Sequence, residues 1–313
     1  MIHVSNLSKY FDEFCAVDQV SFSVNPGEVL GFLGPNGAGK STTMKMLTGF
    51  LAPSSGNISI MGHDVLHDPV AVQRQIGYLP EGAPSYADMT VLASLKFIGK
   101  ARGFFGHELD VRVEEIVNKV SLESVLNKRV ETISKGYRRR LGLAQALIHD
   151  PKVLILDEPT DGLDPNQKHQ VRELIRNLSA DKIVIVSTHI LEEVSAVCSR
   201  AMILAEGKIV FDGTPGELAA QSDFHNAVTI RLTKKNDTLI ALLRELPSVR
   251  QVMIGEGDLM TVFPKGGEMI LSDINQVLHR EGCQVEELHV EVGRLDDVFR
   301  KITMTANPSE RVA

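Results

Sequence analysis

The stretch GPNGAGKSTT, residues 34–43, brings together three glycines, one lysine and three hydroxyl side chains. Gly34, Gly39, Lys40 and Ser41 fit the spacing G-x-x-x-x-G-K-[ST]. Glycines allow successive backbone N–H groups to face one anion, and a helix that begins after the loop adds the positive end of its dipole. The lysine can reach the β- and γ-phosphates of a nucleotide, and the serine hydroxyl can ligate Mg²⁺. This chemistry predicts a site for a nucleoside triphosphate and Mg²⁺.

A second candidate group lies more than a hundred residues later, in VLILDEPTDGLD at 153–164. Four apolar residues lead to Asp157, so its carboxylate is expected at a strand end, where it can hold Mg²⁺ through water. Glu158 follows directly and points to the other side of the strand. One carboxylate can therefore serve the metal while its neighbour polarises a water molecule.

The glycine-rich loop is flanked by a predicted strand and a predicted helix. Residues 29–33 form a continuous apolar run, and the helix is expected to begin near Lys40 and to stop at Gly49. Upstream, residues 2–4 and 16–24 are expected to be strands. This strand–loop–helix order is the context in which the motif binds phosphate.

Further elements indicate a parallel sheet. Continuous apolar runs at 153–157 and 182–188 suit strands that are covered on both faces, and 166–178 is helical between them. Residues 88–135 carry one-sided apolar periodicity and are predicted to be a helical insertion. Together these elements predict an α/β fold.

The character of the sequence changes at FDGTPGEL, 211–218, where glycine and proline mark a boundary. Beyond it the order β–α–β–β–α–β predicts a ferredoxin-like α+β domain over 222–305, followed by a tail at 306–313. Its strands are expected at 226–233, 249–254, 258–263 and 284–291, and its helices at 236–245, 268–281 and 294–302.

Composition excludes several classes of protein. The balance of 33 basic and 40 acidic residues gives a net charge of −7, which argues against a general affinity for nucleic acid. Cys15, Cys198 and Cys283 lie far apart without a CxxC pair, so neither a disulfide framework nor a thiolate metal site is expected. No apolar run approaches the roughly 18–20 residues that span a bilayer, and the N-terminal residues do not resemble a signal peptide. If the protein acts at a membrane, we expect another chain to supply the span.

The stretch ISKGYRRRLGLAQAL, 133–147, discriminates among the kinases, GTPases and RecA-like motors that could share the first two motifs. With it, the sequence resembles the ATP-binding subunit of ABC transporters, and it is most similar to the family that drives ABC-2-type exporters. The resemblance covers about residues 1–218 and implies an ABC ATPase fold, in which a mixed sheet core carries an antiparallel β-subdomain and a helical subdomain at about 88–138. The region beyond resembles the accessory C-terminal domain of many such subunits.

The resemblance also assigns roles to individual residues. GPNGAGKST matches the Walker A loop, LILDEP matches Walker B, and DGLD matches the D-loop, whose final Asp164 is expected among the nucleotide contacts. STH places the switch histidine at His189, which is expected to bind the γ-phosphate and to act with Glu158 in catalysis. The implied ATP contacts in the Walker A loop are Asn36, Gly37, Ala38, Gly39, Lys40, Ser41 and Thr42.

ISKGY stands where the family usually has LSGGQ, and it keeps the serine and the second glycine. In the family this signature turn closes on ATP bound to the partner subunit, so Ser134 and Gly136 are expected to contact the nucleotide of a second copy. Lys135, which replaces a glycine, either attracts phosphate or is solvated. Arg138 and Arg139 are expected on an exposed face.

Two further contacts are implied. In GYLPEGAPSY, Glu81 occupies the place of the family's Q-loop glutamine, and a carboxylate there can also face Mg²⁺, together with Ser41 and Asp157. The adenine ring is expected to stack on Phe11, or on the adjacent tyrosine, and Val17 is expected to border the same ring.

The implied function is a cytoplasmic ATPase, peripheral on the inner face of the cell membrane, that dimerises around two Mg·ATP and powers export through separate ABC-2-type permease subunits. Two alternatives stay open. One is a soluble ABC-type ATPase that acts on ribosomes or DNA, although such proteins usually carry two cassettes, a coiled-coil insertion or zinc fingers. The other is a P-loop kinase outside the family.

Overall fold

The computed structural model describes residues 1–234, 236–255 and 259–306, and the chain divides into two compact units, Met1–Gly213 and Thr214–Thr305. The division falls inside the glycine- and proline-containing stretch at 211–218. Of the tail predicted at 306–313, all but Ala306 lies outside the described residues. No helix within the described ranges is both long enough and apolar enough to cross a membrane.

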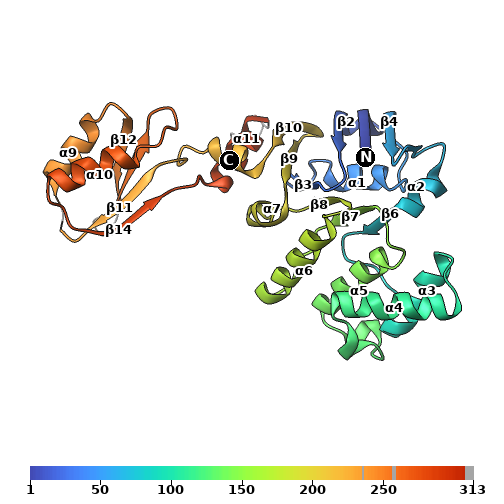
Figure 1. Cartoon of the computed structure of the whole chain (residues 1–313). Coiled ribbons are helices and arrows are strands. Elements are labelled where there is room, and N and C mark those ends of the chain that lie inside the picture. Colours follow the sequence, from blue (N-terminus) through green and yellow to red (C-terminus); the bar gives the residue numbers. More distant parts are fainter. Residues whose placement is uncertain (235, 256–258, 307–313) are drawn as a thin grey trace. The chain divides into compact units, whose positions relative to one another are not determined.

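The central sheet of the first unit has six strands (Figure 1). All neighbours pair in parallel except β10, which runs antiparallel to β9. Helices α1 (Lys40–Leu47), α2 (Pro69–Gln75), α6 (Pro165–Leu178) and α7 (Leu191–Val197) belong to the same unit. In spatial order the strands are β10 (Lys208–Gly213), β9 (Arg200–Ala205), β3 (Val29–Leu33), β8 (Ile183–Ser187), β7 (Val153–Asp157) and β6 (Ile76–Leu79).

Successive residues of β7 belong to two different cores, because side chains alternate across a sheet. Val153 and Ile155 pack into the cluster that includes the buried side chains of α1, whereas Leu154 and Leu156 pack into the cluster formed with the helical subdomain. This two-sided burial explains why the strand is apolar throughout, as the sequence predicted. The polar residues that follow Asp157 lie where the strand ends, at the carboxyl end of the sheet.

A second sheet of the first unit is antiparallel, with the order β2-β1-β4-β5. Its strands are β1 (Ile2–Phe11), β2 (Phe14–Val24), β4 (Ser55–Ile60) and β5 (His63–Asp64). The strand predicted at 2–4 thus continues to Phe11, because β1 and β2 form a long hairpin in which Phe11 pairs with Phe14. The hairpin brings its aromatic end into the same sheet as the buried Val17.

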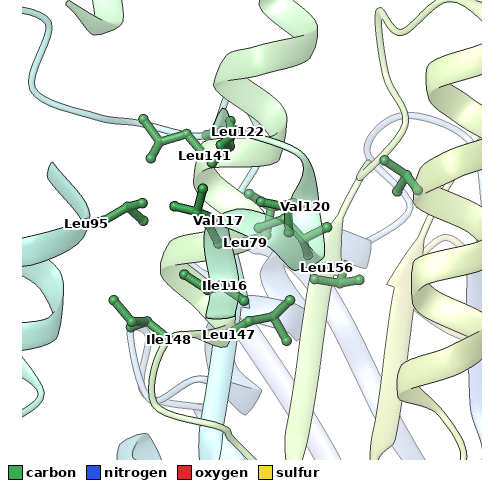
Figure 2. Packing of buried hydrophobic residues seen from close by; sticks show 14 of the residues in the cluster. Leu79, Leu95, Ile116, Val117, Val120, Leu122, Leu141, Leu147, Ile148 and Leu156 are labelled. Carbon is green, nitrogen blue, oxygen red and sulfur yellow. The ribbon is translucent and has the colours of Figure 1, made fainter. Parts of the chain in front are cut away.

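The helical subdomain contains α3 (Val91–Ala101), α4 (Gly106–Val120) and α5 (Lys135–Leu147), which lie together in Figure 1, and two short 3₁₀ turns. The side chain of Thr90 caps α3 by accepting a hydrogen bond from Ala93 N at 3.1 Å. Figure 2 shows Leu95, Val117 and Leu141 from these helices in one cluster with Leu79 and Leu156 of the central sheet. This shared core fixes α5 against the sheet.

The second unit has the ferredoxin-like topology that the sequence predicted. Its antiparallel sheet has the order β12-β13-β11-β14, and the apolar faces of α9 and α10 pack on it. The elements are α8 (Pro215–Ala220), β11 (Val228–Leu232), α9 (Asp237–Glu245), β12 (Val249–Ile254), β13 (Leu259–Pro264), α10 (Leu271–Arg280), β14 (Val285–Val290) and α11 (Leu295–Ala306).

Candidate functional site

The glycine-rich loop joins the end of β3 to α1, and its glycines have backbone conformations that other residues adopt only with strain. The φ angles of Gly34, Gly37 and Gly39 are 153°, 81° and 99°. A Cβ atom on Gly39 would lie 2.4 Å from the carbonyl oxygen of Ala16, whereas nothing lies within 4 Å of a Cβ on Gly37. The loop therefore packs closely on its own sheet at one end and keeps an open face at its tip.

Lys40 extends back over this loop. The side chain is buried, with 8% of its surface exposed, and its Nζ donates hydrogen bonds to the carbonyl oxygens of Gly34 at 2.6 Å and Pro35 at 3.1 Å. Burial lowers the pKa of Lys40, while the negative charges of Glu158, Asp157 and Glu81 act in the opposite direction. The same three carboxylates also act on the buried Arg139, so three negative charges are balanced by two positive ones and the site can still attract a cation.

The acidic residues after β7 lie next to the end of β8. Asp157 is buried, with 3% of its surface exposed, and accepts a hydrogen bond from the hydroxyl of Ser187. The backbone N–H of Glu158 donates to the carbonyl oxygen of Ser187 at 3.1 Å, and Glu158 has a left-handed backbone with φ 50°. Such a conformation in a non-glycine residue costs about 1–3 kcal/mol and often occurs at functional sites.

The two residues predicted to act in catalysis are in contact. Nδ1 of His189 lies 3.0 Å from both carboxylate oxygens of Glu158. The glutamate side chain is 15% exposed and the histidine 57% exposed. Burial raises the pKa of Glu158, and the hydrogen bond from His189 opposes this effect. The pair provides a proton acceptor at the edge of the sheet, with an imidazole that holds it in place.

Glu81 follows β6 and is exposed to solvent. Burial and the charges of Asp157 and Glu81 raise the pKa of Tyr78 to about 12, which indicates that both carboxylates act on the same edge of the sheet. Within the described residues, no group of three or more His, Cys, Asp or Glu side chains could hold a metal ion by itself. The two carboxylates of Asp157 and Glu81 suit Mg²⁺, which usually combines one or two carboxylates with water and substrate phosphates.

The predicted adenine contacts lie on the β1–β2 hairpin. Phe11 and Tyr10 are each nearly half exposed, so the structure leaves both aromatic rings available for stacking. Val17 is fully buried, and one of its methyl groups would lie 3.3 Å from a Cβ atom on Gly39. It therefore packs directly against the phosphate loop.

The signature turn opens α5. Ser134 caps this helix by accepting a hydrogen bond from the backbone N–H of Tyr137 at 3.3 Å, and the helix begins at Lys135. Lys135 forms an ion pair with Asp161 of its own chain, with Nζ 2.8 Å from Oδ2. Both side chains are at least half exposed, so this pair contributes little to stability. A Cβ on Gly136 would clash with the side chain of Gln167.

Asp164, the last residue of the D-loop, caps α6. Its Oδ1 accepts a hydrogen bond from the backbone N–H of Gln167 at 2.9 Å. Because Gln167 also covers Gly136, the first turn of α6 lies beside the first turn of α5. The D-loop and the signature turn of one chain therefore form a continuous surface.

The prediction that Arg139 lies on an exposed face is wrong, although Arg138 is exposed as predicted. Arg139 is 6% exposed, because it shares the buried face of α5 with Gly136 and Leu143. Its guanidinium donates hydrogen bonds to backbone carbonyl oxygens at the end of β7 and after β6.

Sequence reasoning also missed Glu193, a buried acidic residue on α7 with 6% of its surface exposed. Its Oε2 accepts hydrogen bonds from Thr160 Oγ1 at 2.5 Å and Thr188 Oγ1 at 3.1 Å. Lys168 Nζ lies 3.5 Å from its other oxygen. Thr160 follows the Walker B residues and Thr188 precedes His189, so one carboxylate joins both loops. In the sequence, only the apolar periodicity of α7 could have indicated that Glu193 lies on the buried face of the helix and its neighbour Glu192 on the exposed face.

A glycine-rich loop between a parallel strand and a helix, with acidic side chains after the neighbouring strand, defines a P-loop nucleotide-binding protein. Sequence comparison makes this assignment more specific. The model of the ABC transporter family matches residues 17–161. The ABC transporter ATP-binding protein YxlF of Bacillus subtilis is 36% identical over 96% of this chain and 99% of its own length. The chain therefore belongs to the ATP-binding proteins of ABC transporters, and it is an ATPase.

Other relatives and solved structures agree. The Nod factor export ATP-binding protein I of Cupriavidus metallidurans is 32% identical over 97% of each chain. The linearmycin resistance ATP-binding protein LnrL of Bacillus subtilis is 29% identical over 97% of this chain and 98% of its own. A solved ATP-binding subunit of an ABC transporter is 31% identical, with a TM-score of 0.65, and covers 71% of this chain and 92% of its own.

Proposed function

We propose that two copies of this chain close head to tail around two Mg²⁺–ATP and that this closure drives export through separate membrane subunits of the ABC-2 type. The main support for the proposal is the contact between Glu158 and His189. The pair lies close enough to Lys40 for the charge of Glu158 to act on the lysine. This arrangement suits hydrolysis of a triphosphate. The signature turn begins another helix, α5, and its first N–H groups suit an anion supplied by a second copy.

In this proposal the Walker A residues Asn36–Thr42 bind the phosphates of ATP, and Phe11 contacts the adenine. Val17, expected to border the same ring, is fully buried, so it supports the loop from beneath instead. Ser41, Asp157 and Glu81 would hold Mg²⁺. The open face at Gly37 and the excess of carboxylates around Lys40 support these assignments. When bound, Mg²⁺ neutralises charge on the phosphate oxygens.

Glu158 would accept a proton from the water that attacks the γ-phosphate, and the products would be ADP and phosphate. A pKa raised by burial suits a general base, because it brings proton affinity closer to the working pH. His189 would hold the carboxylate and bind the γ-phosphate. Loss of that phosphate removes contacts from both copies, so the dimer opens after hydrolysis.

Ser134, Gly136 and Asp164 would contribute the second half of each site from the partner copy. The continuous surface formed by the first turns of α5 and α6 supports this assignment. A dimeric structure of a bacterial ABC transporter cassette is 25% identical to this chain, with a TM-score of 0.64, and covers 69% of this chain and 99% of its own. That likeness supports a dimer.

A groove of about 700 Å³ offers a site for the membrane subunit. It is lined by the residues that follow α1, by α2 and β6, and by the helical subdomain, and it includes Tyr78, which lies three residues before Glu81. Phe50 and Val70 border it with 79% and 61% of their surface exposed, and Arg74 and Arg102 add positive charge. We infer that an amphipathic helix of the permease, with apolar residues and an acidic residue, binds here from the inner face of the membrane.

Export is the direction that the relatives favour, since one is named for Nod factor export and another for linearmycin resistance. The cytoplasmic side of the membrane follows from the need for ATP. The transported substrate is set by the membrane chains.

The dimer is tested with a Glu158→Gln variant, which retains the shape of the side chain but cannot accept the proton. We expect it to bind ATP, to be inactive, and to form a dimer at saturating MgATP in light-scattering measurements. Lys40→Ala is the matched control and should remain monomeric. A Glu158→Gln protein that stays monomeric with MgATP, both alone and beside its membrane companion, would contradict the proposal.

The membrane partner is tested by purification of the full chain from its own cells under mild detergent. We expect a multi-span membrane protein to copurify, and substitution of Phe50 and Val70 by aspartate to abolish this association without loss of ATP binding. Copurification with ribosomes or DNA instead would favour a soluble ABC-type ATPase.

A further inference from the structure

Arg139 is a buried cation whose hydrogen bonds all go to the backbone. Nη2 donates to the carbonyl oxygen of Asp157 at 2.7 Å and to that of Glu158, and Nη1 donates to the carbonyl oxygen of Pro80 at 3.3 Å. The first two oxygens belong to consecutive residues at the end of β7. The third precedes Glu81. One guanidinium therefore joins the segments that carry all three carboxylates around the phosphate loop.

The geometry at Glu158 explains why such a connection matters. Its left-handed backbone conformation is strained for a residue with a side chain, so it persists only where neighbouring groups hold it. The backbone N–H of Glu158 is held by Ser187. The two carbonyl oxygens on either side of the Glu158 Cα are held by Arg139. Together these bonds fix both peptide planes that meet at the Glu158 Cα, and hence the direction of its side chain.

A role in packing alone does not account for this residue. Burial lowers the pKa of Arg139, because removing its charge from water has a cost, while the negative charges of Asp161, Asp157, Glu158 and Glu81 act in the opposite direction. An apolar or amide side chain of similar length would fill the same space without that cost. The planar fork of a guanidinium, however, can donate to two carbonyl oxygens at once.

We propose that Arg139 is the positioning residue for Glu158 and that it couples the catalytic carboxylate to the helix that begins at the signature turn. The inference depends on the proposed function, in which Glu158 accepts the proton from water. Arg139 lies five residues after Ser134 on α5. A movement of this helix, when Ser134 meets the nucleotide of the partner copy, is therefore transmitted to the peptide planes at Glu158. Each site becomes competent for hydrolysis only when the signature turn of its own chain is engaged.

The test compares Arg139→Gln, Arg139→Lys and the exposed neighbour Arg138→Gln in the full chain, with kcat and KM for ATP normalised to the number of ATP-binding sites. We expect Arg139→Gln to lower kcat by about 10- to 100-fold, because small displacements of a reacting group have effects of this size. KM for ATP should change by less than about threefold, since the residues proposed to bind ATP are unchanged. Arg139→Lys keeps the charge and a donor and should recover part of this loss. Arg138→Gln should resemble the wild type.

A second measurement separates positioning from damage to the fold. In the Glu158→Gln background, Arg139→Gln should leave MgATP-dependent dimerisation unchanged, since the ATP contacts lie on other residues. The inference is overturned if Arg139→Gln retains wild-type kcat, or if kcat, ATP affinity and dimerisation fall together. If Glu158→Gln itself hydrolyses ATP or fails to dimerise, the proposed function fails instead, so the two failures are distinguishable.

Discussion

Replacement of Glu193 by alanine tests whether the buried carboxylate on α7 holds the two loops of the catalytic site together. The carboxylate accepts hydrogen bonds from Thr160 at 2.5 Å and Thr188 at 3.1 Å, and Lys168 lies 3.5 Å away. Alanine leaves both hydroxyl groups without this acceptor. Each unsatisfied buried donor costs about 1–3 kcal/mol, so the two together cost about 2–6 kcal/mol, and because water that enters the space recovers part of this we expect a loss of about 3–4 kcal/mol.

Glutamine at the same position should cost less. It retains one acceptor oxygen for both hydroxyl groups, but its amide would face the ammonium of Lys168, where Glu193 now presents a charged oxygen. A loss of about 1–2 kcal/mol is expected, since the charge-assisted component disappears while the hydroxyl bonds remain.

Urea unfolding of the full chain without nucleotide measures this effect. The transition of the ATP-binding unit is the one that moves when MgATP is added, because ligands stabilise the state that binds them. Glu192→Ala, on the exposed neighbour, is the matched control and should change stability by less than about 0.5 kcal/mol. If Glu193→Ala is no more destabilising than Glu192→Ala, the buried carboxylate does not hold the loops.

Three further results are expected. Burial lowers the pKa of His149 to about 4, below its ordinary 6.5, so the unfolded state binds the extra proton first and stability should fall by roughly 2–3 kcal/mol between pH 6.5 and 4. Urea titrations of His149→Gln should lack this decline. Gly39→Ala places a Cβ 2.4 Å from the carbonyl oxygen of Ala16 and should weaken ATP binding at least about tenfold in a titration. Phe11→Ala should weaken it about tenfold and Tyr10→Ala less than about twofold, or the stacking ring is misassigned.

The sequence was sufficient to predict the parts of the site that depend on local order. The loop at 34–43 needs glycine wherever its φ is positive, and the strand before Asp157 is apolar because both of its faces are covered. The second unit was predictable for a similar reason, since its helices and strands follow simple periodicities. Each of these features is visible within a dozen residues of chain.

Features that depend on distant contacts could not be predicted. Arg139 lies between two other arginines, the exposed Arg138 and the half-buried Arg140, and only the positions of β6 and β7 make it a buried donor. Glu193 is adjacent to another glutamate, and the periodicity of α7 can at most place it on the inner face, without revealing that Thr160 and Thr188 approach it. Charged residues are expected on the surface by default, so a buried one is found from its partners and not from its type.

The two buried charges both act on segments that carry Glu158 and His189, the proposed catalytic pair. Arg139 fixes the backbone at Glu158, whereas Glu193 ties the segment that follows Glu158 to the segment that precedes His189. The 3.0 Å contact between Glu158 and His189 spans these two segments, so a shift in either is enough to break it. The effects of Arg139→Gln and Glu193→Ala on kcat should therefore be less than multiplicative, because once one segment is displaced the contact is lost and the second substitution has little left to remove. Independent effects that multiply would mean that the two charges stabilise separate features of the fold.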